Sequence, residues 1–400
     1  MDKNKPDPLA PYRAFTDRHR QAGRERHLRT AIPLPEGRVE IAGRRLLSFA
    51  GNDYLGLAHH PALRERAVAY VQAYGTGAGA SRLVTGNLPF YDRIEARLAA
   101  AKGYDRALVM TSGMQANMTV LAALADPAVR GPGVTVFADR LCHNSLLQGA
   151  RLSGARLVRF RHNDPEHLEN LLKAHAARPD PGRGLIVSET VFSMEGDVAD
   201  VEALRTLARR FGALLYLDEA HAFGLSGPGG FGLTATEGAD VVMGTFGKAL
   251  GSFGAFVACR EDLAAYLVQR CGGLIYSTAL PPPVLGAIEA GLELLPTLDD
   301  SRARLRDMSR RLRIALRDQG WEVRGGETPI IPLLIGPEQK TLDLAAALLN
   351  RGLVVPAIRP PTVPPHASRL RVTLSAAHTD ADLEALLAAL GDLLPKAPNR

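Results

Sequence analysis

The sequence predicts an α/β protein built on a mostly parallel sheet. Short apolar runs alternate with helical segments from about residue 60 onward. That alternation is typical of βαβ units, whose helices cover both faces of the sheet. We expect strands at residues 107–110, 134–138, 156–160, 185–188, 214–217 and 241–244.

The segments around this core have their own patterns. Residues 10–30 predict a helix rich in Arg and His, and short strands follow near 38–41 and 46–49. Fewer than ten residues separate the expected strands 240–245 and 254–259. A parallel crossover needs a dozen or more residues, so this pair is predicted to be antiparallel. The helical segments before the first strand of the core are 62–74 and 91–101.

The C-terminal part predicts a smaller α+β unit after the prolines at 281–283. Its pattern indicates helices at 285–295 and 302–318, followed by strand, helix, strand and helix at 330–335, 342–351, 370–374 and 380–394. We therefore predict three parts: residues 1–50, a large cofactor-binding domain over 51–285, and a small domain over 286–400.

Charge and cysteine content limit the function classes. The 400 residues carry a net charge of +6, and the basic residues are spread along the chain, so no nucleic-acid partner is expected. Three cysteines without a CxxC pair favour a reducing compartment, and the polar start has no signal-peptide core, so we expect a cytoplasmic protein. The uncharged stretch 107–125 has polar residues near its middle, which indicates a strand, a loop and a helix and no membrane span.

Chemically active side chains follow several strands, at the sheet edge where open α/β proteins bind ligands. Asp218 and His221 follow the run 214–217, and Thr245 and Lys248 follow the run 241–244. Taken singly, Asp218 could cap a helix and Lys248 could be a solvated loop lysine. Together they suit pyridoxal phosphate (PLP), because a lysine forms its Schiff base and a carboxylate keeps its pyridine nitrogen protonated.

Two further strand ends fit such a site less specifically. Ser112, Gly113 and Met114 begin a predicted helix, whose free N–H groups could hold a phosphate, although an ordinary helix cap explains them equally well. His143 follows the run 134–138, and a lone histidine is more often structural.

Two motifs point elsewhere but lack their required context. Residues 75–80 match the G-x-G-x-x-A dinucleotide pattern, yet they follow a predicted helix and not a strand. Gly247 and Lys248 resemble a phosphate-binding P-loop, but Ala249 stands where Ser or Thr must bind magnesium. No spacing supports a metal site.

Longer motifs carry a resemblance to the α-oxoamine synthases, PLP enzymes of fold type I. It covers nearly the whole chain and rests on residues 52–57 (NDYLGL), 112–113 (SG), 192–197 (FSMEGD), 218–221 (DEAH), 245–248 (TFGK), 275–278 (IYST) and 371–378 (RVTLSAAH). The resemblance implies a PLP-dependent acyltransferase that works as a homodimer. Residues 357–364 (AIRPPTVP) resemble the substrate loop of the branch that condenses L-alanine with a pimeloyl thioester of CoA or a carrier protein.

The resemblance also implies roles for individual residues. Lys248 would bind the cofactor and remove a proton, Asp218 would pair with the pyridinium, and His143 would stack on the ring. The remaining implied contacts are Ser193 and His221 to the ring oxygen; Gly113, Met114 and Thr245 to the phosphate; Ser277 and Thr278 to the phosphate of the neighbouring subunit; Asn52 and Arg371 to the amino-acid carboxylate; and Thr362 and Arg26 to the acyl chain.

Some alternatives stay open at this point. Arg369 and Arg371 share one face of a strand, so spacing cannot separate them. Arg26 competes with Arg18, Arg20, Arg24 and Arg29, and all of them could be a solvated basic surface. For the activity, the alternatives are another α-oxoamine synthase that uses glycine or serine, an NAD-dependent oxidoreductase built on residues 75–80, and a PLP-binding protein without turnover.

Overall fold

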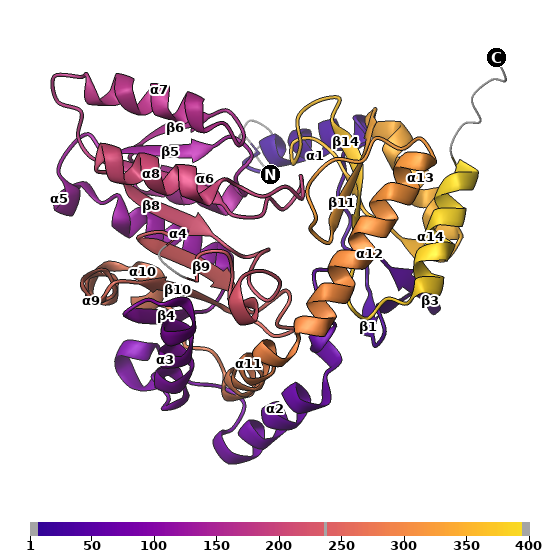
Figure 1. Ribbon diagram of the computed structural model, residues 1–400, viewed down its shortest axis with the longest axis horizontal. Helices are drawn as coiled ribbons and strands as arrows, with labels where there is room; N and C mark the ends of the chain where they lie inside the picture. Colours follow the sequence, from indigo (N-terminus) through magenta and orange to yellow (C-terminus); the bar gives the residue numbers. More distant parts are fainter. Residues whose placement is uncertain (1–6, 236–237, 394–400) are drawn as a thin grey trace.

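The computed structural model describes residues 7–235 and 238–393. A seven-stranded sheet forms the larger part of the molecule (Figure 1). Its strands lie in the order β4 (Arg106–Met110), β10 (Ala255–Cys259), β9 (Val241–Thr245), β8 (Leu214–Asp218), β7 (Gly184–Glu189), β5 (Thr135–Asp139) and β6 (Arg156–Phe160).

The central strands are mostly apolar because both faces of the sheet are covered. Val136 and Ala138 of β5 pack on one side, in the cluster that includes α4 (Gly113–Leu124) and α6 (Asn144–Leu152). Phe137, between them, packs on the other side with α7 (Pro165–Ala176) and α8 (Val201–Phe211). This alternation confirms the α/β prediction.

Strand directions follow the lengths of the connections. β9 and β10 are antiparallel, as predicted from their short separation, and β10 is also antiparallel to β4. The pairs β5–β6, β5–β7, β7–β8 and β8–β9 are parallel. The carboxyl ends of β5, β7, β8 and β9 therefore meet at one edge of the sheet.

The remaining helices surround this sheet or lead away from it. α2 packs against α11, and α3 packs against β4. These helices are α2 (Pro61–Tyr74), α3 (Phe90–Lys102), α5 (Pro127–Arg130), α9 (Glu261–Arg270), α10 (Gly272–Ile275), α11 (Pro282–Leu294) and α12 (Asp299–Asp318). Short 3₁₀ or π turns lie at Leu57–His59, Arg82–Gly86, Pro228–Gly230 and Leu295–Thr297.

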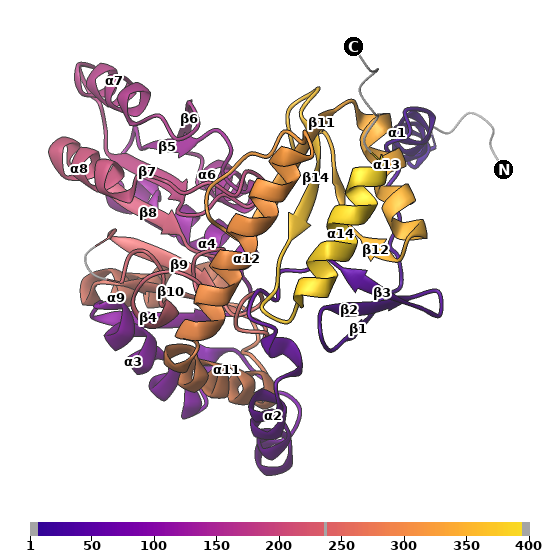
Figure 2. The ribbon, with the colours of Figure 1, turned by 45° about the vertical axis from the view of Figure 1, so that its right-hand side comes forward.

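Two small sheets lie beside the large one (Figure 2). The first contains β11 (Ile330–Gly336), β14 (Ser368–Thr373) and β13 (Ala357–Ile358). The second joins β1 (Ile32–Leu34), β2 (Arg38–Ile41) and β3 (Arg44–Ser48) from the start of the chain to β12 (Leu353–Val354). The N-terminal strands thus share a sheet with the C-terminal part, while the predicted domain boundaries stay predictions.

The predicted N-terminal helix is too long. α1 (Ala10–Gln21) ends nine residues earlier than expected, because Gly23 has a φ of +65° and the chain then leaves the helical path. Arg24 binds Glu338 at the start of α13 (Glu338–Asn350), which ties this segment to the C-terminal part of the chain. The last predicted helix is α14 (Asp380–Leu393); its expected residue 394 lies outside the described residues.

The stretch 107–125 has the predicted composition of strand, loop and helix. It forms β4, a two-residue turn and α4, with Ser112 as the helix cap. Among the described residues, no helix is both long and apolar enough to cross a membrane.

Candidate active site

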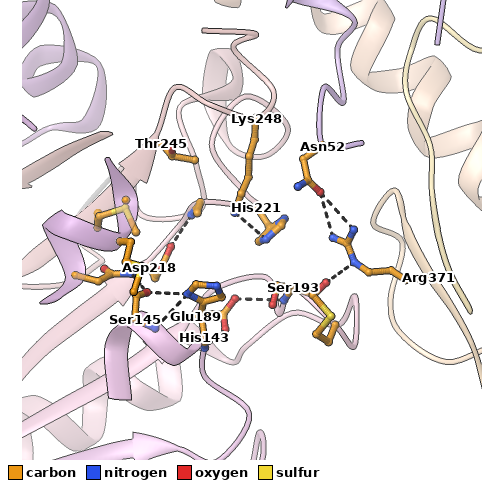
Figure 3. A pocket seen from close by; sticks show the side chains of 16 residues that line it. Asn52, His143, Ser145, Glu189, Ser193, Asp218, His221, Thr245, Lys248 and Arg371 are labelled. Carbon is orange, nitrogen blue, oxygen red and sulfur yellow. Dashed lines mark hydrogen bonds between the residues drawn. The ribbon is translucent and has the colours of Figure 1, made fainter. Parts of the chain in front are cut away.

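A pocket of about 290 Å³ opens at the carboxyl ends of β7, β8 and β9 (Figure 3). Ten of the predicted site residues line it: Asn52, Gly113, Met114, His143, Ser193, Asp218, His221, Thr245, Lys248 and Arg371. They come from segments more than 300 positions apart in the chain, and the fold brings them together.

Lys248 and His221 face each other across the pocket wall. Nζ of Lys248 lies 2.8 Å from Nε2 of His221. Burial lowers the pKa of Lys248 to about 8, although the charges of Asp218 and Glu189 act in the opposite direction. Burial and the Lys248 charge lower the pKa of His221 well below its ordinary value, so its ring is neutral at pH 7. The site therefore holds an amine that loses its proton more readily than an exposed lysine does.

Asp218 and Glu189 are adjacent carboxyl groups on paired strands. Glu189, the last residue of β7, is the register partner of Asp218 on β8. Burial, and then the nearby Asp218 charge, raise the pKa of Glu189 to about 8. Oε1 of Glu189 accepts from the backbone N–H of His143 at 2.6 Å, and Oε2 accepts from that of Ser193 at 3.2 Å. Glu189 thus connects two loops that carry predicted site residues.

Six lining residues were not predicted from the sequence: the polar Asn117, Ser145 and Glu189, and the apolar Met194, Ala220 and Met243. Glu189 could have been predicted as a site residue, because it directly follows the apolar run 185–188 at the edge of the sheet where ligands bind. Asn117 and Ser145 could not have been predicted, since they lie within helices α4 and α6 that meet only in the folded protein.

Arg369 and Arg371 of β14 have different partners. Arg371 donates to Oδ1 of Asn52 at 3.3 Å and to the carbonyl of Ser193 at 2.7 Å, and it lines the pocket. Arg369 forms an ion pair with Glu195 at 2.5 Å. Only Arg371 is therefore in position to meet a ligand, a distinction that spacing along one strand could not make.

The start of α4 offers backbone donors to the pocket. Ser112 caps the helix by accepting from the N–H of Gln115, which leaves Gly113 and Met114 in its first turn. The hydroxyl of Thr245 donates to the carbonyl of Gly254 at 2.8 Å and accepts from the N–H of Gly247. A helix N-terminus beside a fixed hydroxyl is suited to an anion such as a phosphate group.

Four predicted residues lie outside this pocket. Arg26 and Thr362 line a second pocket of about 620 Å³ between α1 and residues 357–362. Ser277 accepts from the side chain of Gln115, and Thr278 is paired with Ser81. Residues 75–80 follow α2, so they lack the strand–turn–helix context of a dinucleotide loop.

Comparison with known proteins gives the family. The model of the class I and II aminotransferases matches residues 44–390, which is most of the chain. The chain belongs to this aminotransferase family. Membership and the relatives below confirm the prediction of a PLP-dependent transferase of fold type I and contradict the NAD-dependent alternative.

Similar members of the family carry one name. The chain is 53% identical to a putative 8-amino-7-oxononanoate synthase of Paramagnetospirillum magneticum, over 96% of this chain and 97% of that protein. It is 52% identical to the 8-amino-7-oxononanoate synthase of Gluconacetobacter diazotrophicus, over 88% and 89%.

Solved structures of family members have the same fold. Serine palmitoyltransferase of Sphingomonas wittichii covers 97% of this chain and 98% of its own, with a TM-score of 0.89 and 28% identity. The 8-amino-7-oxononanoate synthase of Francisella tularensis covers 87% and 97%, with a TM-score of 0.73 and 26% identity. The neighbours confirm the predicted resemblance to the α-oxoamine synthases.

Proposed function

We propose that the protein is an 8-amino-7-oxononanoate synthase. It would condense L-alanine with a pimeloyl thioester, releasing carbon dioxide and the free thiol. The observation that carries the proposal is the convergence of Lys248, Asp218 and Arg371 on one pocket, in a chain about half identical to relatives of that name.

The residues of the pocket fit PLP as the cofactor. Asp218 is a buried carboxylate, Lys248 is an amine with a lowered pKa, and the start of α4 presents backbone donors. These groups suit a pyridinium nitrogen, an aldehyde and a phosphate, in that order. Bound PLP supplies an electron sink for the pair released when a bond at the amino-acid Cα breaks.

Lys248 is the residue that would hold the cofactor and move the proton at Cα. Its pKa of about 8 leaves a useful neutral fraction of the amine near pH 7. His221, neutral and 2.8 Å away, would orient this amine and contact the ring oxygen with Ser193. Asp218 would hold a protonated ring nitrogen by its charge, since it is 4% exposed and little screened by water.

Arg371 and Asn52 would bind the carboxylate of L-alanine. The guanidinium is anchored on its Nε side by the carbonyl of Ser193, and its terminal nitrogens are directed toward Asn52 at the pocket wall. A planar donor pair of this kind holds a carboxylate in one orientation, which fixes the bond that breaks.

The acyl thioester would enter from the second pocket. Arg26 and Thr362 lie there with Arg359, whose guanidinium donates to the carbonyl of Gly23. Cationic side chains beside a proline-rich loop suit an acidic acyl chain and an anionic thioester carrier. Ser277 and Thr278 lie outside the main pocket. As the family resemblance implies, they would contact the phosphate of a second subunit in a homodimer.

A cytoplasmic location completes the proposal. Cys142, Cys259 and Cys271 are all free and buried, as suits a reducing compartment.

Release of CoA from pimeloyl-CoA, measured with L-alanine, glycine and L-serine, tests the proposed function. We expect turnover with L-alanine and formation of 8-amino-7-oxononanoate. Turnover with glycine or serine alone would overturn the proposal in favour of another α-oxoamine synthase. A Lys248→Ala protein should bind no PLP covalently, so the visible band that borohydride removes from the wild type should be absent.

A further inference from the structure

Asn117 on α4 connects two side chains of the active site that lie on different elements. It is 1% exposed, and each polar atom of its amide has a partner. Nδ2 donates to Oδ2 of Asp218 at 2.8 Å and to Oγ of Ser145 at 2.9 Å. Oδ1 accepts from the hydroxyl of Tyr216 at 2.8 Å.

These partners determine the orientation of the amide. Burial raises the pKa of Tyr216 well above its ordinary value, so the hydroxyl keeps its proton and can donate it. With the amide reversed, its oxygen would face the carboxylate of Asp218, and two acceptors would lie within hydrogen-bond distance. Nδ2 must therefore face Asp218 and Ser145.

The fixed orientation of the Asn117 amide also determines the direction of the hydrogen bond between Ser145 and His143. Since Oγ of Ser145 accepts from Asn117, its own hydrogen is directed to Nδ1 of His143, 2.7 Å away. The backbone N–H of Ser145 also faces Nδ1 at 3.3 Å, because His143 caps α6. Two donors at one ring nitrogen require an unprotonated nitrogen there.

His143 is therefore a neutral imidazole with its proton on Nε2. Burial and the Lys248 charge act in the same direction, because they lower the pKa of the ring against the charge of Asp218. Nδ1 is occupied by its two donors from Ser145, while the ring lines the pocket and leaves Nε2–H available to donate.

We propose that Asn117 is a positioning residue that holds the carboxylate of Asp218 and, through Ser145, keeps His143 as a neutral donor at Nε2. The inference rests on the proposed function in one respect only: the ligand that accepts from Nε2–H of His143 would be the amino acid or the thioester of the proposed reaction. The protonation of His143 follows from this chain's own contacts.

The test uses the ring-nitrogen NMR signals of His143 in full-length protein labelled with ¹⁵N-histidine and prepared without cofactor. A His143→Gln variant assigns the signals. We expect the wild type to show one tautomer, protonated at Nε2. In Asn117→Leu and Ser145→Ala the signals should move part of the way toward the average of the two tautomers, because the Ser145 hydroxyl is then free to accept or is absent, and only the backbone N–H of residue 145 still opposes a proton at Nδ1.

Ser309→Ala is the matched control. Ser309 is also a buried serine whose hydroxyl accepts from one side chain, Arg313, and donates to another group, the carbonyl of Thr328. Its loss should leave the signals of His143 unchanged, since Ser309 lies on α12 and does not line the pocket.

A second measurement is the dissociation constant of PLP. Asn117→Leu removes a charge-assisted hydrogen bond from Asp218, so the constant should rise about tenfold or more. Ser145→Ala should raise it less. Unchanged His143 signals in both variants would overturn the proposal, and so would an Asn117→Leu protein that binds PLP as tightly as Ser309→Ala.

The NMR signals of His143 and the dissociation constant of PLP test this inference independently of whether the proposed reaction takes place. If Asn117→Leu does not fold, Ser145→Ala still tests the link to His143 by its NMR signals. Because those signals are recorded without cofactor or substrate, a failure of the proposed reaction would leave their outcome unaffected.

Discussion

The hydroxyl of Tyr54 lies 2.6 Å from Nδ1 of His221, on the side of the ring opposite Lys248. Tyr54 is 1% exposed, and burial raises its pKa to about 12, so it stays protonated. It also contacts Oδ1 of Asn52 at 3.2 Å. The sequence shows Tyr54 only as part of the motif at residues 52–57, whereas in the structure its hydroxyl is the hydrogen-bond partner that orients His221.

Tyr54→Phe should therefore weaken cofactor binding as well as the fold. The change leaves Nδ1 of a buried histidine without a hydrogen bond, which costs about 1–3 kcal/mol. We expect a lower free energy of unfolding in urea and a several-fold higher dissociation constant for PLP. Tyr104→Phe is the control, because that hydroxyl bonds the backbone of Ala239 outside the pocket. Equal PLP affinity of both variants would contradict the role of Tyr54.

Arg371→Lys and Arg369→Lys should have opposite profiles. Lysine cannot replace the planar donor pair, so Arg371→Lys should raise KM for L-alanine at least about tenfold. Arg369→Lys disturbs the ion pair with Glu195 and the bond to the carbonyl of Met194, so it should mainly lower stability. Steady-state kinetics and urea unfolding of both proteins check this. A larger KM effect in Arg369→Lys would show that the ligand-binding arginine is misassigned.

The strand-end residues could be predicted because their position depends on local pattern. Each apolar run ends at the sheet edge, so the polar residue that follows it reaches the site, as Asp218 and Thr245 do. Motif resemblance then supplied residues from other segments, such as Asn52 and Arg371. These predictions needed only the order of the elements and no packing detail.

Packing between elements decided the rest. Asn117 and Ser145 meet because α4 packs on α6, and no spacing along the chain reports that contact. Arg369 and Arg371 share one face of β14, and their different partners depend on where the loop at 193–195 passes. The early end of α1 depends on the backbone at Gly23, which helical periodicity does not reveal.

His162 should make the stability of the protein depend on pH. Its Nδ1 lies 3.0 Å from Asp139, and its Nε2 lies 2.9 Å from Asp197, in the loop that also carries Ser193. Burial lowers the pKa of His162, but the hydrogen bonds and charges of the two carboxylates outweigh it and raise the pKa to about 10. The native state therefore holds a proton that the unfolded chain releases above its own pKa of about 6.5.

The sign of this linkage defines the test. The stabilisation is fully present below about pH 6.5 and is lost as the pH rises toward 10, by at most about 1.4 kcal/mol per pH unit. His162→Gln should cost about 2 kcal/mol at pH 7 and show a flatter decline between pH 7 and 10. Urea unfolding across this range compares the two proteins. Parallel curves would mean that His162 is not protonated in the native state.

The ion pair between Lys102 and Glu219 is predicted to stabilise the fold beside the site. Nζ of Lys102 lies 2.5 Å from Oε2 of Glu219, and both side chains are fully buried. Lys102 also donates to the carbonyl of Phe231, and Glu219 accepts from the N–H of Thr234. The pair therefore ties the segment 231–234 to the residue that follows Asp218.

Removing one partner should be far worse than removing both. Lys102→Met leaves a buried carboxylate without its cation, so we expect a loss of about 3–5 kcal/mol in urea unfolding. The double variant Lys102→Met with Glu219→Gln carries no uncompensated charge and should recover at least half of that loss. Neither side chain lines the pocket, so the folded double variant should bind PLP with wild-type affinity. If the double variant instead lost as much unfolding free energy as the two single variants together, the two buried charges would not stabilise each other and the prediction would be wrong.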